Sequence, residues 1–242
     1  LLIELQHPES SEIMQFSLDD KLNLKSGSKL SPELPVKRYS FIPNIKNKKT
    51  NIPFLIPPSG NNLMHVVEQN KELKNDLTNI FSEYGLSIVF DKASQSLKII
   101  KNNEGKELFL IPYNSIADTL QRIIFYKSAI ASNKNSVLLF EEPEAHSFPP
   151  YIIHITQQII HSQNNQFFIS THSPYIVNDF LENSRDDLSI FSTDFRNGQT
   201  VVRQLTKEEM FDIYINLALI YLLTMKAFYK YDRFINYPGM LC

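Results

Sequence analysis

Two short apolar runs, residues 136–140 (SVLLF) and 166–170 (QFFIS), constrain the fold of this chain more than any other feature. Each has the length and composition of a buried strand. Between them, residues 150–161 place isoleucines at helical spacing and begin with prolines, which suit the first turn of a helix. Two strands joined by a helix of this length form a βαβ crossover, in which the strands are parallel and buried. The sequence therefore predicts an α/β fold with a parallel-sheet core.

The rest of the chain divides around this unit. Helical spacing also appears in residues 116–130 and 62–84, and Gly85 stands where a helix C-cap glycine is expected. Ser173 and Pro174 open a further helix after the second strand. Residues 96–111 read as a β-hairpin that turns at Asn102 to Gly105.

We predict three regions. Residues 1–112 form a β-rich and helical N-terminal insertion, in which the first 60 residues are an antiparallel β region or long surface loops. Residues 113–213 form the α/β core half, with a short helix over Lys207 to Ile213 near its end. Residues 214–242 are a tail for which two interpretations stay open: a reading-frame change that leaves a non-native apolar tail, or a C-terminal helix packed on the sheet.

Acidic and basic groups follow both strands of the βαβ unit. Glu141 and Glu142 come directly after the first strand, and Thr171 and His172 directly after the second. Ligands of open α/β sheets bind at the carboxyl ends of the strands, so we expect these side chains to converge. Two carboxylates and an imidazole suit Mg²⁺-dependent phosphoryl chemistry. The alternative is that the charges mark only where the chain leaves the core.

Three segments resemble one known family, in its order and at its distances. "VLLFEEPEAHSFPP" looks like the Walker B segment and catalytic glutamate of ABC-type ATPases, in particular the SMC-like and OLD-like AAA family ATPases. "FFISTHSPYIV" resembles their switch-histidine strand, and "ADTLQRIIFYKSAIASNKNS" the helix after their signature loop. The resemblance covers residues 57–205 and implies the C-terminal part of a P-loop NTPase fold.

The resemblance also implies roles for individual residues. Glu141 takes the place of the metal-associated Walker B acid, where more distant members have Asp. Glu142 takes the place of the catalytic glutamate that positions the hydrolytic water, and His172 that of the histidine that contacts the γ-phosphate. Glu144 and His146 fall in the loop that, in the family, meets the partner subunit at the bound ATP.

The signature loop departs from the family pattern. Relatives place a Ser and a Gly where this chain has Ile116 and Asp118, and aspartate adds negative charge where phosphate would approach. Ser115 and Thr119 are the remaining hydroxyl candidates for nucleotide contact. Arg122, on the following helix, faces nucleotide or anchors the loop, and both readings stay open.

The sequence contains no P-loop. None of its six glycines begins the pattern G-x-x-x-x-G-K-[ST] that cradles phosphates. We therefore expect that this chain on its own would not hold ATP with normal affinity. The expected cofactors are ATP and Mg²⁺, in a homodimer formed through the nucleotide interface, with a separate effector protein or DNA as a further partner and a role in defence or DNA maintenance by analogy alone.

Composition narrows the remaining classes. A net charge of −2 gives no overall electrostatic footprint for nucleic acid, and a single cysteine excludes a disulfide framework and fits a reducing, cytoplasmic environment. The most apolar stretch, residues 215–228, is too short to cross a bilayer, so no membrane partner is expected.

Two other functions were weighed. Without a P-loop, the chain is alternatively a non-catalytic module that dimerises with or regulates a complete ATPase. A metal-dependent nuclease using Glu141 and Glu142 would need a third carboxylate, and Asp186 and Asp187 follow a predicted helix rather than a strand end.

Overall fold

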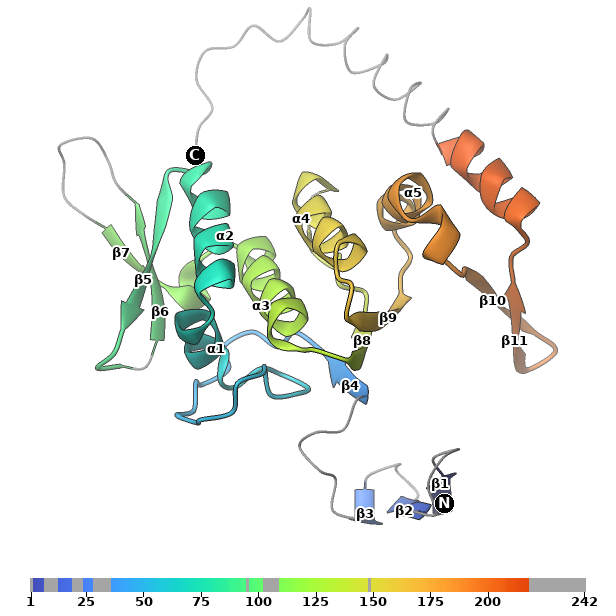
Figure 1. The fold of residues 1–242 in the computed structure, drawn as a ribbon, viewed down its shortest axis with the longest axis horizontal. Coiled ribbons are helices and arrows are strands. Elements are labelled where there is room, and N and C mark those ends of the chain that lie inside the picture. The colour runs from blue at the N-terminus through green and yellow to red at the C-terminus, as the bar shows by residue number, and fades with distance from the viewer. Residues whose placement is uncertain are drawn as a thin grey trace, which may run out of the picture.

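The computed structural model describes residues 2–6, 13–18, 24–27, 36–94, 96–101, 109–147 and 149–217 (Figure 1). The apolar tail beyond residue 217 and the expected turn at Asn102 to Gly105 lie outside the described residues, so both predictions about them stay open.

The central sheet has three parallel strands in the order β4 (Val36–Tyr39), β8 (Ser136–Glu141) and β9 (Asn165–Ser170). The predicted parallel pairing of β8 with β9 is confirmed. We expected the segment around β4 in an antiparallel N-terminal region, and that was wrong. Its four residues pair with β8 across about a hundred positions of chain, which no local pattern reveals.

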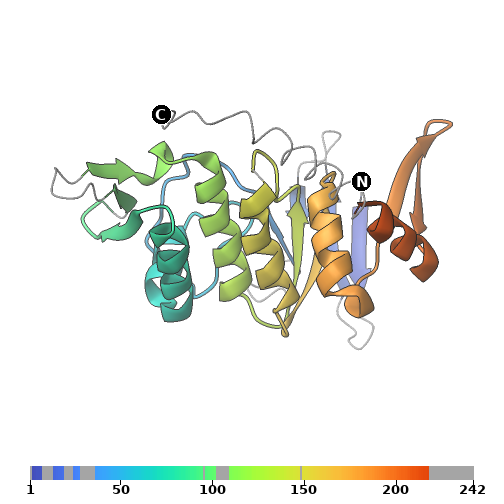
Figure 2. The same ribbon diagram turned by 90° about the horizontal axis from the view of Figure 1, so that it is seen from above.

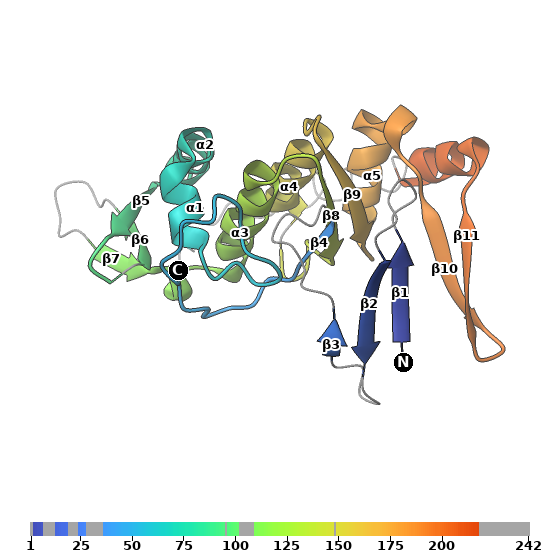
Figure 3. The ribbon, with the colours of Figure 1, turned by 60° about the horizontal axis from the view of Figure 1, so that its bottom comes forward.

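Three helices cover one face of this sheet: α3 (Asp118–Ser132), α4 (Pro149–Ile160) and α5 (Pro174–Asn183) (Figures 2 and 3). The apolar spacing predicted α3 and α4 to within two residues at each end, and Ser173 and Pro174 predicted the start of α5. Alternate residues of β8, including Leu138 and Phe140, point under these helices and are buried. The α/β architecture with a parallel sheet is thus the observed one.

The opposite face of the sheet is largely bare. Val36 on β4 and Phe168 on β9 are 52% and 54% exposed, and Leu139 between them is only partly buried. Leu139 pairs directly with Phe168, and Val36 pairs with Val137, two residues before Leu139 on the same face of β8. The three side chains therefore lie in adjacent rows of one face of the sheet. Parallel sheets normally bury both faces, so this apolar surface is unusual.

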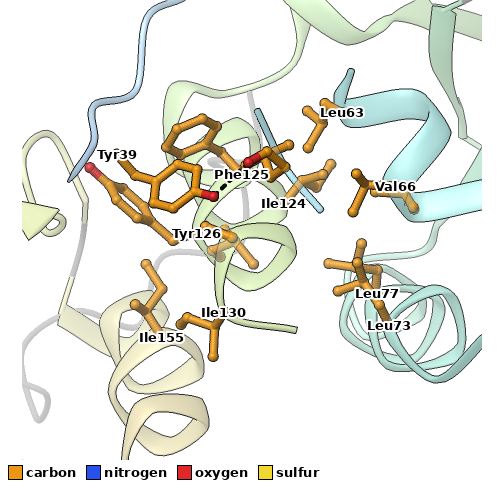
Figure 4. Packing of buried hydrophobic residues seen from close by; sticks show 14 of the residues in the cluster. Tyr39, Leu63, Val66, Leu73, Leu77, Ile124, Phe125, Tyr126, Ile130 and Ile155 are labelled. Atoms are coloured by element: carbon orange, nitrogen blue, oxygen red, sulfur yellow. Dashed lines mark hydrogen bonds between the residues drawn. The ribbon is translucent and has the colours of Figure 1, made fainter. Parts of the chain in front are cut away.

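The core is built around aromatic rings. Tyr39 makes edge-on contacts with Phe125 and Phe140, and Tyr126 packs in the same manner on both of those phenylalanines (Figure 4). Such edge-to-face pairs stabilise beyond the area they bury. The Tyr39 hydroxyl donates to the Leu55 carbonyl at 2.5 Å, and the Leu55 amide donates to Ser132 Oγ at 2.9 Å, so the long loop after β4 is fixed against both β4 and α3.

A buried polar network lies beside these rings. The Lys37 ammonium donates to Asn133 Oδ1 at 2.8 Å and to Ser136 Oγ at 3.2 Å. Asn133 Nδ2 donates to the Tyr39 hydroxyl at 2.9 Å and to the Ala129 carbonyl at 2.7 Å. Burial lowers the pKa of Lys37, because an ammonium loses its hydration there.

Gly60 closes the loop onto the core. Its φ is +71°, and a Cβ atom at this position would lie 2.9 Å from Phe125 Cε2 and 3.0 Å from Leu55 Cδ1. Glycine is required here both for its backbone conformation and for lack of room.

The N-terminal half also holds a helical and β-rich lobe made of α1 (Leu63–Gln69), α2 (Lys71–Ser82), β5 (Leu86–Asp91), β6 (Ser96–Lys101) and β7 (Phe109–Pro112). The single helix expected over residues 62–84 is two, because the Asn70 side chain accepts from Leu73 N at 3.0 Å and caps a new helix. Gly85, at φ +65°, ends the second helix as predicted. The antiparallel pairing of β6 with β7 confirms the predicted hairpin.

A separate sheet of β1 (Leu2–Gln6), β2 (Ile13–Leu18) and β3 (Leu24–Gly27) confirms the antiparallel character of the first 30 residues. The division at 112/113 stays a prediction, although β4 from the first region lies inside the central sheet.

After α5 the chain forms a hairpin that we did not predict. Strands β10 (Phe191–Arg196) and β11 (Gln199–Gln204) are joined by Asn197 and Gly198, at φ +53° and +78°. Positive φ at both positions is the type I′ turn that favours tight hairpins. Every residue of the two strands is exposed. Residues 207–217 are helical, as expected from Lys207 onward.

Candidate functional site

The predicted convergence at the carboxyl ends of β8 and β9 is present. Glu142 directly follows β8, and His172 lies two residues beyond β9. Glu142 Oε1 is 3.3 Å from His172 Nε2. Both side chains are open to solvent, since His172 is 91% and Glu142 48% exposed, so a ligand can reach them.

An unusual backbone conformation turns Glu142 toward His172. Its φ is +41°, a region that non-glycine residues seldom occupy, and its amide donates to the Ser170 carbonyl at 2.9 Å. This bond extends the pairing of β8 with β9 by one residue. Backbone strain of this kind costs about 1–3 kcal/mol and persists only when surrounding contacts fix it.

Glu141 lies one residue earlier and has a different partner. Its Oε2 accepts from Arg38 Nη2 at 2.5 Å, and both side chains are 60% exposed. Sequence reasoning missed Arg38, because only the pairing of β4 with β8 brings it to the site. Arg38 could have been predicted as a partner of Glu141 only if the order of strands in the sheet had been known.

Glu144 points inward. Its Oε1 accepts from the Thr171 hydroxyl and, at 3.2 Å, from the His172 amide. Its second oxygen, Oε2, is buried and has no hydrogen-bond partner among the residues that the structure describes. The carboxylate therefore joins the loop after β8 to the loop after β9, within the same chain.

His146 and Thr119 meet through a backbone contact. The Thr119 hydroxyl, in the first turn of α3, donates to the His146 carbonyl at 3.1 Å, while the His146 side chain is exposed. His146 has φ +59°, so the loop has a second left-handed residue. The start of α3 is thus tied to the same loop that carries Glu142 and Glu144.

Arg122 is anchored. Its Nε donates to Asp118 Oδ2 at 2.9 Å, its guanidinium lies 4.7 Å from the centre of the Phe41 ring, and its side chain is 12% exposed. Asp118, at the position of the family's glycine, is the residue that holds it. Ser115 is exposed at the end of a 3₁₀ turn (Tyr113–Ser115), and the only contact of its hydroxyl that the structure records is to Asn114. The structure therefore joins Glu142 and Glu144 to the loop that carries His172, whereas Glu141 contacts Arg38, and Ser115 and Arg122 have partners outside this group.

Glu141 is an exposed carboxylate, which is the ligand type that Mg²⁺ takes in proteins. Mg²⁺ in phosphoryl-transfer sites is bound by one or two carboxylates together with phosphate oxygens and water. Glu141 would supply that carboxylate, in exchange for its contact with Arg38. No group of three acidic, histidine or cysteine side chains suited to an all-protein metal site occurs among the described residues, and Asp186 and Asp187 lie in a 3₁₀ turn (Arg185–Asp187) after α5.

A hollow opens beside Glu141 on the bare face of the sheet. It encloses about 390 Å³ and is lined by residues of all three strands, namely Arg38, Leu139, Phe140, Glu141, Phe168, Ile169 and Ser170. Beneath it, burial raises the pKa of Tyr126, whose ring packs on Phe140. The hollow is thus mainly apolar, and the ion pair of Arg38 with Glu141 supplies its charged groups.

No helix in the described part of the chain is both long and apolar enough to cross a membrane.

No family model matches the chain. No curated protein matches it either. Among solved structures, the fold is similar to SMC head domains. One, from a study of ATP-driven dimerization and DNA-stimulated activation of SMC ATPases, is 14% identical with a TM-score of 0.44, and the match covers 64% of this chain and 97% of that one.

The Smc head domain of Pyrococcus yayanosii, with its coiled coil and joint, is 15% identical with a TM-score of 0.41, over 63% of this chain and 30% of that one. The Smc head of Pyrococcus furiosus, bound to the C-terminal domain of ScpA, is 16% identical with a TM-score of 0.42, over 64% and 40%. The chain thus spans less than half the length of these two relatives.

Proposed function

We propose that this chain carries the hydrolytic half of an ATPase site of the ABC/SMC-like class. The observation that supports it most directly is the pair of Glu142 and His172, 3.3 Å apart at the carboxyl ends of adjacent parallel strands. A residue that orients the attacking water and accepts its proton is a recurring part of phosphoryl-transfer sites, and an adjacent imidazole could donate to the phosphate.

In this proposal Glu142 orients the attacking water and takes up its proton as the bond to the γ-phosphorus forms. His172 donates to an oxygen of the transferred phosphoryl group, and ADP leaves with the electrons of the broken bond. Magnesium, when bound, neutralises charge on the phosphates, and Glu141 would hold it. Both side chains are open to solvent, so a phosphate can reach them, and it would take the place of their direct 3.3 Å contact.

The phosphate cradle has to come from polypeptide outside these 242 residues, since the sequence holds no P-loop. The sheet has a place for such a segment. β9 is one of the two edge strands of the described sheet, and its Phe168 side chain is exposed to solvent. An edge strand offers unpaired backbone groups, so a strand beside β9 would bring its following loop next to His172.

Following the family resemblance, we also propose a homodimer with ATP at its interface, with Ser115, Thr119 and His146 on the nucleotide-facing rim. Thr119 and His146 lie within one hydrogen bond of each other at that rim. A separate effector protein or DNA, a role in defence or DNA maintenance and a cytoplasmic location stay predictions.

The test is the nucleotide chemistry of Glu142→Gln. The chain would be produced together with a polypeptide that supplies a phosphate-binding loop, and ATP turnover and retained ATP would be measured in Mg²⁺. We expect wild type to hydrolyse ATP and Glu142→Gln to lose turnover by at least about a hundredfold while retaining ATP, in line with the loss of a general base. Glu182→Gln, an exposed glutamate on α5, is the matched control and should behave as wild type.

The non-catalytic reading predicts the opposite result. If the chain only regulates a complete ATPase, wild type and Glu142→Gln should bind that ATPase equally well, and the ATPase activity of the partner should be the same with either. Equal turnover for wild type and Glu142→Gln would overturn the proposed ATPase.

A further inference from the structure

Glu144 has contacts that a nucleotide-facing residue would not need. Both hydrogen bonds to its Oε1 come from the loop after β9, one from the Thr171 hydroxyl and one from the His172 amide. Thr171 in turn accepts from the Ser173 amide at 2.9 Å. One carboxylate oxygen thus fixes the backbone on both sides of His172.

The loop that carries Glu144 is itself fixed at both ends. Glu142 N donates to the Ser170 carbonyl, and the His146 carbonyl accepts from Thr119 at the start of α3. Between these points, Ala145 N donates to the Glu142 carbonyl and Ser147 N to the Glu144 carbonyl, at 3.0 and 2.9 Å. The loop is therefore a compact turn that holds its shape and can transmit position.

The burial of Glu144 also argues for a specified role. Its Oε2 is buried with no partner among the described residues. Leaving a carboxylate oxygen unpaired is costly, and a solvated turn residue would avoid this. Through its other oxygen the side chain gains the link to Thr171 and His172.

We propose that Glu144 is the positioning residue for His172: it holds the imidazole within reach of Glu142 and couples it, through the turn and Thr119, to the start of α3. This rests on the proposed ATPase function, whose site it deepens. Without Glu144, strand β9 stays paired with β8, but the loop after β9 loses the two hydrogen bonds that orient His172.

The first test is amide hydrogen exchange on the full chain, read residue by residue by NMR. In Glu144→Ala the His172 and Ser173 amides should exchange at least about tenfold faster, as expected for the loss of a charge-assisted bond. The β8 and β9 amides should keep their protection. Glu182→Ala should change neither set.

Two further variants separate position from charge and from misfolding. Glu144→Gln keeps an acceptor oxygen and should restore slow exchange. Thr171→Val removes the hydroxyl that donates to Glu144 and accepts from the Ser173 amide. The Ser173 amide therefore exchanges faster in this variant for a direct reason, and the informative amide is His172, which should also exchange faster if the Thr171 hydroxyl holds Glu144 in place. If the β8 and β9 amides also lose their protection from exchange in Glu144→Ala, that variant is misfolded, and the comparison of Thr171→Val with Thr171→Ser decides the question. Equal exchange of the His172 amide in wild type and Thr171→Val would overturn the proposal.

The second test is kinetic and uses the complete ATPase. Glu144→Ala should lower kcat about tenfold with KM for MgATP unchanged, because positioning acts in the transition state, and Glu144→Gln should recover kcat. A Gln variant as slow as the Ala variant would assign the effect to charge and refute positioning. If wild type itself fails to hydrolyse ATP, the proposed function fails, while the exchange pattern still decides the role of Glu144 in placing His172.

Discussion

Replacement of Gly60 by alanine tests the account of how the loop after β4 closes on the core. Two costs add. A left-handed backbone costs an L-residue about 1–2 kcal/mol, and Gly60 has φ +71°. The new Cβ would lie 2.9 Å from Phe125 Cε2 and 3.0 Å from Leu55 Cδ1, closer than carbon atoms approach without displacement.

Neither neighbour can move into solvent, because Phe125 is 2% and Leu55 0% exposed. Overpacking a closed core costs about 1–3 kcal/mol. We therefore expect Gly60→Ala to lower the free energy of unfolding by about 2–5 kcal/mol, measured by equilibrium unfolding in urea followed by circular dichroism.

Gly85→Ala is the matched control. Gly85 has nearly the same φ, +65°, but nothing lies within 4 Å of the position of a Cβ. It should cost only the backbone term, about 1–2 kcal/mol. If the two variants lose the same free energy within about 0.5 kcal/mol, the steric argument for Gly60 is wrong and only the backbone term remains.

Three other measurements test the core and the start of α3. Asn133→Ala takes the acceptor at 2.8 Å from the buried Lys37 ammonium and should cost about 2–4 kcal/mol in urea unfolding; a loss below about 1 kcal/mol would mean that Lys37 finds another partner. Burial raises the pKa of Tyr39 far above its usual value near 10, so its contribution is complete below pH 10 and is lost as pH rises further. Between pH 10.5 and 12 the stability should therefore fall by up to about 1.4 kcal/mol per pH unit for this group, and Tyr39→Phe should show a shallower slope; equal slopes would refute the assignment. Asp118→Ala breaks the pair with Arg122 and should cost about 0.5–1 kcal/mol in thermal unfolding, less in high salt; no salt dependence would contradict an electrostatic anchor.

Periodicity carried the prediction of the core. The isoleucine spacing of α4 and the two continuous apolar runs indicated a βαβ crossover, and the parallel pairing of β8 with β9 followed from it. The same reasoning failed for β4, whose four residues show that a strand exists but not which strand it joins. The hairpin of β10 and β11 was not predicted although Asn197 and Gly198 signal it, because both strands are exposed along their whole length and neither has a buried apolar face.

At the site, sequence order predicted which residues meet but not how they face. Glu142 and His172 follow strands that share an edge, so their proximity was readable from the chain. The inward turn of Glu144 was not, since it depends on left-handed backbone at Glu142 and His146, which the residue types do not demand. Arg38 reaches Glu141 only because β4 pairs with β8.

The bare face of the central sheet has a practical consequence for anyone who produces this chain. A surface that shows Val36 and Phe168 beside a strand edge resembles the contact that seeds aggregation. Association through such a surface weakens on cooling and strengthens in sulfate or phosphate buffers. Purification should therefore give the most soluble protein at low temperature, at low protein concentration and in chloride buffers. Coexpression of a polypeptide that covers this face of the sheet should raise the yield more than any change of buffer.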